Sequence, residues 1–245
     1  MIESMDKIMN KFEILFGLKE SQIKSTCIIM PFLKKGILKD FGIKQLSKGR
    51  LYSTGNSASF TLIHTGISAS LTGDAVLYLS NTSCKNIILF GSCGLVESTK
   101  DIKLGCLITP LNCLSMESFT EMLSASNKDC NISYPDKNML ESFLNTNNQY
   151  VKKTACASVG SLNLEGENVD LFRTKGIQVV DMECSAVFSA SKHIGCKAIS
   201  LLYVTDILAE KPFYMKLNKK EEEIINSSTK NAVRILCDFI KKLSL

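Results

Sequence analysis

Short apolar runs of strand length alternate along this chain with stretches whose apolar residues recur at helical spacing. Several of the runs are apolar at every position, which is typical of strands that helices cover on both faces of a sheet. The predicted strands are residues 27–30, 60–64, 87–90, 177–180 and 198–204. This alternation predicts an α/β fold with a central, largely parallel mixed sheet flanked by helices.

Three stretches have the pattern of helices that pack on such a sheet. In residues 71–79 the apolar side chains share one face. Residues 182–193 are rich in small side chains, with Asp181 placed to cap the start and Gly195 to end the helix. Residues 219–243 combine an apolar face with a charged one. We therefore expect helices at these three places.

The 245 residues fit a single α/β domain. We expect one domain over residues 1–245, with its core at about 26–240 and no linker rich in proline or glycine. The stretch 112–150 is rich in Asn, Ser and Lys, and we predict it to be the least regular part, as an insertion or a lid. In a largely parallel sheet, functional groups are expected at the carboxyl ends of the strands.

Composition narrows the classes of partner. No apolar run approaches the roughly 20 residues that a membrane span needs, and residues 1–7 mix acids and bases, unlike a secretory signal. We therefore expect a cytoplasmic protein with no membrane partner. The net charge of +5 is spread along the chain, there is no Trp, and no aromatic residues alternate with a basic stripe. A nucleic-acid partner is not indicated.

The ten cysteines are scattered, mostly inside apolar segments, and the chain has only two histidines. No Cys-x-x-Cys pair occurs, so the ligand spacing of a closed zinc site is absent. The pattern predicts buried free thiols in a reducing compartment, with no metal site.

Polar and glycine residues gather where the predicted strands end. Glycine-bearing turns are expected at 65–68 and at 91–95, where backbone N–H groups can approach an anion or a sugar. The carboxylate of Glu183 follows one strand, and that of Asp206 follows another. Each feature has a structural alternative: a tight turn, an acid in the first turn of a helix, or a helix cap.

These segments together resemble the nucleoside phosphorylase and nucleosidase family. The run Lys85-Asn86-Ile87-Ile88-Leu89-Phe90-Gly91-Ser92-Cys93-Gly94 is similar to that of the hexameric bacterial purine nucleoside phosphorylases. The run Val180-Asp181-Met182-Glu183-Cys184-Ser185-Ala186 is close to the family signature, as are Ala198-Ile199 and Val204-Thr205-Asp206. The resemblance extends in order over about 26–240, and it implies the nucleoside phosphorylase-like α/β fold.

The resemblance also implies roles for individual residues. Glu183 and Met182 would bind the ribose, with Thr65 nearby, and Asp206 would be the general acid at the base. Further base contacts would come from Leu162 and Asn163. The phosphate or nucleophile subsite would comprise Ser92, Gly66, Lys34 and Lys35. The family needs no cofactor beyond inorganic phosphate as a co-substrate, acts on a small-molecule nucleoside, and forms homo-oligomers, so we expect a dimer or hexamer.

The chain departs from the family at the nucleophile subsite and the base subsite. Leu89 stands where phosphorylases have an arginine, and 31–36 lacks the Gly-Asp-Pro-x-Arg motif. The glutamates with which nucleosidases activate water are also absent from 32–38. The base-stacking aromatic expected within 158–166 is missing. We predict phosphorolysis of a purine nucleoside, with hydrolysis of the methylthioadenosine/adenosylhomocysteine type as one alternative and a non-catalytic nucleoside-binding or storage protein as another.

Overall fold

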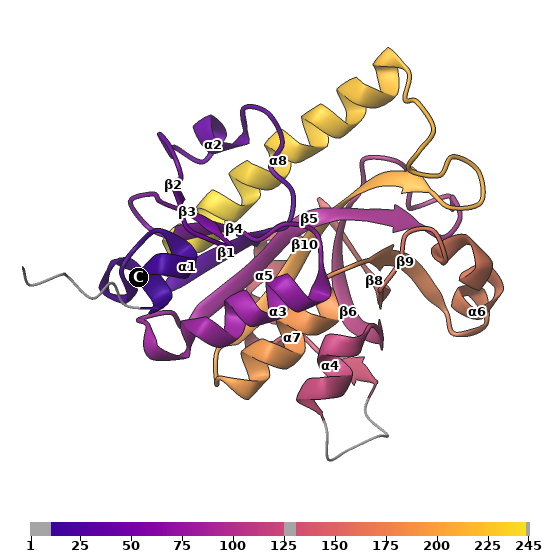
Figure 1. Ribbon diagram of the computed structural model, residues 1–245. Coiled ribbons are helices and arrows are strands. Elements are labelled where there is room, and N and C mark those ends of the chain that lie inside the picture. The colour runs from indigo at the N-terminus through magenta and orange to yellow at the C-terminus, as the bar shows by residue number, and fades with distance from the viewer. Residues whose placement is uncertain (1–10, 125–130, 244–245) are drawn as a thin grey trace, which may run out of the picture.

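The computed structural model describes residues 11–124 and 131–243, and the expectation drawn from residues 1–7 lies outside these ranges. The described chain forms a single α/β domain, in which helices flank a mixed sheet of ten strands (Figure 1). The strands are β1 (Thr26–Met30), β2 (Ser47–Lys48), β3 (Ser53–Asn56), β4 (Thr61–His64), β5 (Asn86–Leu95), β6 (Leu107–Met116), β7 (Ile132–Ser133), β8 (Val151–Val159), β9 (Ile177–Asp181) and β10 (Lys197–Ile207).

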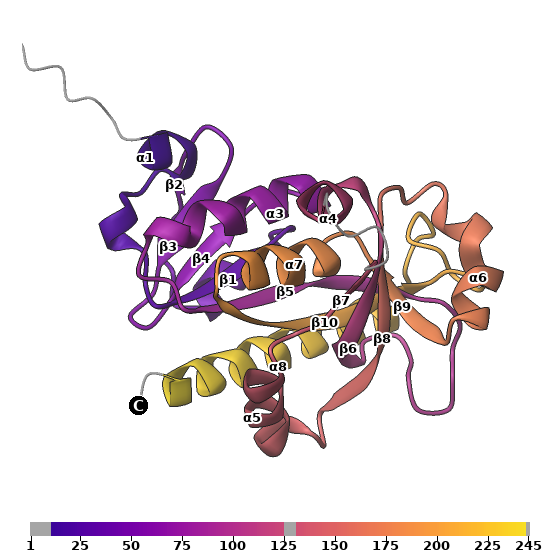
Figure 2. The same cartoon turned by 90° about the horizontal axis from the view of Figure 1, so that it is seen from below.

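The helices pack on both faces of this sheet (Figure 2). They are α1 (Lys11–Phe16), α2 (Ile37–Asp40), α3 (Ala69–Tyr78), α4 (Ser118–Leu123), α5 (Lys137–Asn147), α6 (Val169–Thr174), α7 (Cys184–His193) and α8 (Lys219–Leu243). Short 3₁₀ helices lie at Glu20–Gln22, Leu79–Asn81 and, as η3, Glu165–Asn168. Across the described ranges, no helix is both long and apolar enough to cross a membrane.

The sheet closes on itself around one long strand. Strands β10, β6, β8, β9 and β5 follow one another in hydrogen-bonded order, and β10 also pairs with β5, so these five strands form a ring. From β5 the sheet continues outward through β1, β4, β3 and β2. Five of the strand pairs are parallel and five antiparallel. The predicted mixed α/β sheet is therefore confirmed, although the antiparallel pairs that close the ring were not expected.

One edge of β5 is shared by two strands. Strand β1 pairs with β5 only as far as Leu89, and β9 pairs with it only at Gly94 and Leu95. Between these points, residues 90–93 have no strand partner on that edge. Ligands of α/β sheets bind where neighbouring strands diverge at the carboxyl ends. The gap between β1 and β9 is therefore the expected place for a site.

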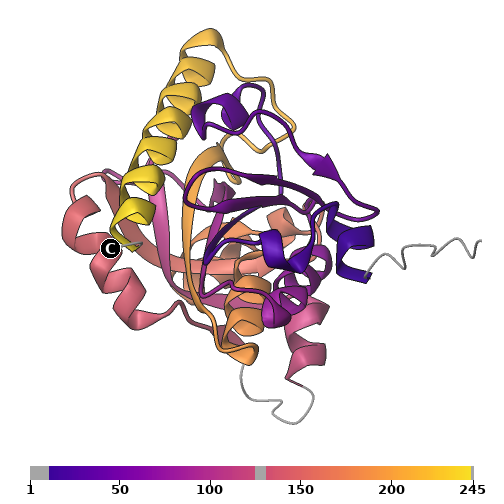
Figure 3. The ribbon, with the colours of Figure 1, turned by 90° about the vertical axis from the view of Figure 1, so that its left-hand side faces the viewer.

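The hydrophobic core lies on both faces of the sheet. On β5, Ile87 and Leu89 face the side covered by α3 and α7, whereas Ile88 and Phe90 face the side covered by α5 and α8. Helices α5 and α8 lie on that second side (Figure 3). Phe143 of α5 and Phe239 of α8 meet edge to face there, with ring centroids 5.1 Å apart. A strand buried on both faces explains why this run is apolar at every position.

The five predicted strands and three predicted helices are present, but two of the strands are longer than expected. Residues 91–95 were predicted to form a turn, whereas they continue β5, because β10 remains paired with it as far as Leu95. For the same reason Asp206 lies inside β10, just past a bulge after Val204, and not beyond the strand end. Glu183 occupies the N-cap position of α7, but Asp181 Oδ2 accepts the hydrogen bond of Cys184 N, the first helical residue, at 2.8 Å. Gly195, with a φ of +73°, follows the last residues of the helix as predicted.

The prediction that 112–150 is the least regular part is wrong for its described residues, whereas its role as an insertion or a lid stays a prediction. This stretch contains the second half of β6, helix α4, strand β7 and helix α5, while 125–130 lie outside the described residues. Met139, Leu140 and Phe143 of α5 belong to the core. The polar composition of the stretch comes from its exposed positions. Because polar residues predominate in any short window of this stretch, the apolar face of its helix is not evident from composition.

Candidate active site

A cleft of about 170 Å³ opens at the gap between β1 and β9 on the edge of β5. Its walls come from the loop after β1, from β5, from the β9–α7 junction, from β10 and from the segment around η3. Among the described residues that line it, four carry carboxyl groups and none is a lysine, arginine or histidine. The cleft is therefore acidic, in spite of the positive charge of the whole chain.

Glu183 lies at the junction where β9 ends and α7 begins. Its side chain lines the cleft, and the residue is only 6% exposed. Burial raises the pKa of its carboxyl to about 7, although the backbone N–H groups of Ser68 and Met182 act in the opposite direction. In the described structure, its Oε1 atom is buried and has no hydrogen-bond partner. Buried polar atoms are nearly always paired, so this oxygen is available to a ligand in the cleft.

Asp206 faces the same cleft from β10 and is also 6% exposed. Thr205 donates a hydrogen bond from Oγ1 to Asp206 Oδ1 at 2.7 Å, and burial raises the pKa of the carboxyl. Gly94 leaves room for this group: a Cβ atom at Gly94 would lie 3.0 Å from Asp206 Oδ2 and 2.6 Å from Leu208 Cδ1. A carboxyl whose pKa is raised in this way can hold a proton and pass it to a ligand.

Asp181 connects the lining of the cleft to a buried hydrogen-bond network. Its Oδ1 accepts a hydrogen bond from Ser158 Oγ at 2.6 Å, and its Oδ2 accepts the bond from Cys184 N. Burial raises the pKa of this carboxyl well above its ordinary range. Cys113 and Cys156 pair across β6 and β8, and their sulfur atoms and an Asp181 oxygen lie within 4.8 Å of one another.

This cluster has the donor types of a metal site, which the sequence spacing did not indicate. However, Asp181 already uses both oxygens to bind protein groups, and Cys113 Sγ lies 3.1 Å from Ser158 Oγ. The hydrogen bonds therefore account for the cluster as part of the core. It fixes the β9–α7 junction that carries Glu183.

The remaining walls of the cleft combine apolar side chains with one hydroxyl. Ser92 of β5, Met182 and Leu162, for which the resemblance implies roles, line it. Two aromatic rings that the sequence analysis missed, Phe32 and Phe213, also line it and are about half exposed. They offer a surface for a planar base in place of the aromatic absent from 158–166. Both lie in loops, so periodicity gave no signal for them.

Glu165 is the functional candidate that the sequence analysis did not single out. It starts η3, lines the cleft and is 6% exposed. Burial and the nearby charge of Asp206 raise the pKa of its carboxyl to about 7. A glutamate in a polar loop looks like a surface residue in the sequence. Only the fold reveals that this one is buried beside another carboxyl.

The structure does not bring the other predicted residues to the cleft wall. Thr65 is buried with its hydroxyl 2.9 Å from Gly66 O and 3.0 Å from Thr72 Oγ1, although the adjacent Ile67 lines the cleft. Asn163 is exposed, and neither Lys34 nor Lys35 belongs to the lining. Partial burial lowers the pKa of Lys34. The roles suggested for these residues stay predictions.

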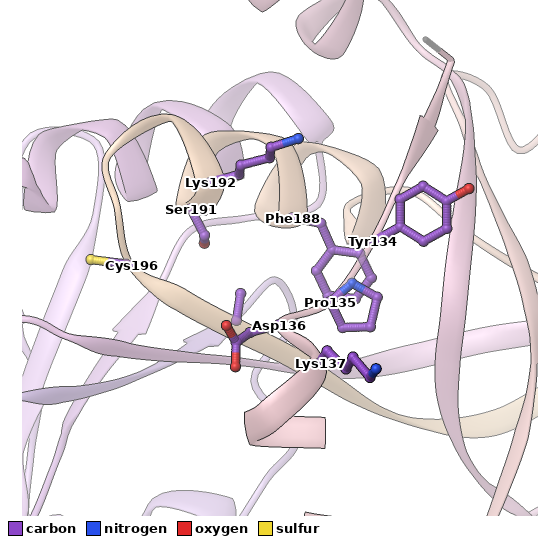
Figure 4. Close-up of a pocket in the computed structure, with 9 residues that line it drawn as sticks. Tyr134, Pro135, Asp136, Lys137, Phe188, Ser191, Lys192 and Cys196 are labelled. Atoms are coloured by element: carbon purple, nitrogen blue, oxygen red, sulfur yellow. The ribbon is translucent and has the colours of Figure 1, made fainter. Parts of the chain in front are cut away.

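A second cleft, of about 300 Å³, lies between α7 and the segment that leads into α5 (Figure 4). Tyr134 and Lys137 line one side, and Ser191 and Lys192 of α7 line the other. This cleft includes Cys196 and Ala198, at the start of β10. Ligand sites of α/β sheets lie at the opposite, carboxyl ends of strands. We therefore assign the candidate active site to the cleft that holds Glu183 and Asp206.

Comparisons with known proteins identify the family of this chain. The family model described as Phosphorylase superfamily matches residues 30–241. A DeoD-type purine nucleoside phosphorylase of Chromobacterium violaceum is 29% identical over 128 residues, which cover 51% of this chain and 52% of that protein. The chain therefore spans about half the length of this curated relative.

Solved structures share the fold at low sequence identity. Uridine phosphorylase from Vibrio fischeri has a TM-score of 0.77 at 19% identity and covers 92% of this chain and 95% of its own. AMP nucleosidase from Bacteroides thetaiotaomicron has a TM-score of 0.69 at 13% identity, with coverages of 91% and 94%. Since the family match includes every segment that lines the cleft, this chain belongs to the phosphorylase superfamily, the family of nucleoside phosphorylases and nucleosidases.

Proposed function

We propose that this chain is an enzyme that cleaves the N-glycosidic bond of a purine nucleoside. The proposal depends chiefly on the buried, unpartnered oxygen of Glu183 in a cleft that also contains Asp206. An unpaired buried acceptor lowers stability unless a ligand satisfies it. The adjacent hydroxyls of a ribose are suitable donors, because a carboxylate can accept both.

The two carboxyls suit the charges that develop as the bond breaks. The sugar becomes positive, in an oxocarbenium-like state, and the base takes the electron pair of the bond. Glu183 beside the sugar stabilises the positive charge. Asp206 gives a proton to a ring nitrogen of the base, which then leaves as a neutral molecule. A buried carboxyl with a raised pKa suits this role, because it retains a proton closer to neutral pH.

The purine class is supported by the acid itself and by a relative. A purine offers a ring nitrogen that can accept a proton while the bond to the sugar breaks. The relative from Chromobacterium violaceum is named as a purine nucleoside phosphorylase, although it matches this chain over only 128 residues. Purine nucleosides are therefore the first substrates to test, with uridine as the comparison that the Vibrio fischeri structure suggests.

The acidic lining of the cleft favours water over phosphate as the nucleophile. Phosphate carries about two negative charges near neutral pH, and the described lining includes no cationic side chain to hold it. In hydrolysis, the water oxygen bonds to C1′ of the sugar and one water proton is released, while the base gains a proton. Phosphorolysis, which the sequence analysis predicted, would need a basic residue from a neighbouring subunit. A homo-oligomer, which we also expect, could provide one.

The test is base release from adenosine, inosine and uridine, each with and without inorganic phosphate. We expect free purine base in both conditions at equal rates, with ribose as the second product. Release only with phosphate, giving ribose 1-phosphate, would support phosphorolysis and a cationic group from a partner subunit. Binding without any release would support the non-catalytic alternative and would contradict the proposed function.

A further inference from the structure

Glu165 is a buried carboxyl for which the described structure provides no partner. It lies at the start of η3, and neither a hydrogen bond nor an ion pair to its side chain is found within residues 11–124 and 131–243. Its side chain lines the cleft, so a ligand there can reach its carboxyl. Buried acids are normally paired. A ligand in the cleft would therefore be the partner of Glu165.

Glu165 and Asp206 act on each other electrostatically. The charge of Asp206 raises the pKa of Glu165, in addition to the effect of burial. The other titratable groups that line the cleft are Asp181, Glu183 and the thiol of Cys93, and none of them is cationic. A lining with carboxyls and no cation therefore favours a base edge that carries a hydrogen-bond donor.

An ionised carboxyl offers only hydrogen-bond acceptors, whereas a protonated one also offers a donor. Thr205 already occupies Asp206 Oδ1, so Oδ2 is the oxygen of Asp206 that remains for a base. An adenine presents an acceptor at N7 beside a donor at its 6-amino group, whereas a 6-oxopurine presents two acceptors on that edge. Asp206, as the proposed acid, can donate to N7 of either purine. Only the amino group of adenine offers a donor to Glu165, whereas a 6-oxopurine would place its carbonyl oxygen against this carboxylate.

We propose that Glu165 and Asp206 bind the nucleobase together, and that Glu165 makes the enzyme select 6-aminopurine nucleosides over 6-oxopurine nucleosides. This inference rests on the proposed function. It adds a residue that determines specificity and a substrate class to the cleavage reaction. Asp206 binds the ring nitrogen that receives the proton, and Glu165 accepts a hydrogen bond from the exocyclic amino group.

The test compares kcat/KM for adenosine and inosine in the unsubstituted protein, in Glu165→Gln and in a control, Glu167→Gln. Glu167 is an exposed residue of the same 3₁₀ helix. The neutral amide can turn either its donor or its acceptor toward the base. We expect the preference for adenosine to fall by about 10-fold to 100-fold in Glu165→Gln, as for loss of a hydrogen bond to a charged group. The control should keep the original preference.

Binding of the free bases adenine and hypoxanthine, measured by calorimetry, tests the same contact without turnover. We expect Glu165→Gln to weaken adenine binding selectively, and circular dichroism checks that the variant is folded. An unchanged preference in Glu165→Gln, for both cleavage and binding, would overturn the inference while leaving the proposed function intact. Equal cleavage of adenosine and inosine by the unsubstituted protein would also overturn it. If that protein released no base from any nucleoside, the proposed function itself would fail.

Discussion

Replacing Glu183 by glutamine removes a buried charge while nearly preserving the size of the side chain. Burial raises the pKa of this carboxyl from 4.5 to about 7. Since one pKa unit corresponds to about 1.4 kcal/mol, ionisation of Glu183 lowers the free energy of unfolding by about 3 kcal/mol. The folded protein binds this proton more tightly than the unfolded chain does. The contribution of the protonated Glu183 to the free energy of unfolding is therefore fully present below about pH 4.5, and it is lost as the pH rises to about 7.

Glu183→Gln should escape this loss. We expect the variant to match the unsubstituted protein at about pH 4.5 and to exceed its stability by about 3 kcal/mol at about pH 8. Urea unfolding across this pH range measures the difference, followed by circular dichroism because the chain has no Trp. Protein concentration must be held constant, because assembly of subunits would change the apparent stability. Exposed Glu167→Gln is the matched control, and its stability difference should not vary with pH.

The same substitution should lower activity. An amide can accept a hydrogen bond from a ribose hydroxyl, but it carries no charge to stabilise a positive sugar. Glu183→Gln should thus be more stable and less active than the unsubstituted protein. Such opposite effects are expected when a functional residue lies in an environment that lowers stability. A stability difference that is independent of pH, together with normal turnover, would refute the reasoning. It would show that Glu183 is neither strongly desolvated nor part of the reaction.

Three other substitutions test neighbouring parts of the site. Asp206→Asn should reduce turnover of purine nucleosides by about 100-fold or more, measured as kcat, and near-normal turnover would remove Asp206 from the acid role. Gly94→Ala should cost about 1–3 kcal/mol in urea unfolding, because its Cβ would lie 2.6 Å from Leu208 Cδ1; unchanged stability and turnover would mean that this contact relaxes freely. Asp181→Ala should cost about 1–3 kcal/mol, because it leaves Cys184 N buried without its acceptor; an unchanged unfolding midpoint would contradict the structural role given to this carboxyl.

Much of the fold follows from local sequence patterns. Strands β1, β4, β5, β9 and β10 were predicted because they are short apolar runs, and the helices α3, α7 and α8 because each has the residue pattern of a helix packed on a sheet. Strands β6 and β8 were missed, since their apolar residues are interrupted by polar ones that face other strands or solvent. The closed ring depends on the β10–β5 and β10–β6 pairings, which join residues far apart in sequence. No local pattern contains that information.

The sequence analysis named the cleft residues that belong to short motifs at strand ends, and it did not name those that lie in loops. Glu183, Asp206 and Ser92 were found from motifs at strand ends, and the structure brings them to one cleft. Glu165 and Phe213 were missed because their burial and position depend on how loops fold over that cleft. Lys34 was suggested as a phosphate ligand by its place after the first strand, but the position of a long side chain cannot be read from sequence spacing.

Release of adenine from adenosine in buffer without phosphate tests most directly whether this cleft is the active site. Chromatography should measure it for the unsubstituted protein, Glu183→Gln and Asp206→Asn, purified in parallel. The variants serve as controls for nucleosidases carried over from the expression host. We predict steady adenine release by the unsubstituted protein and a large reduction in both variants. No release by the unsubstituted protein, with or without added phosphate, or equal release by all three proteins, would contradict the assignment of this cleft as the active site.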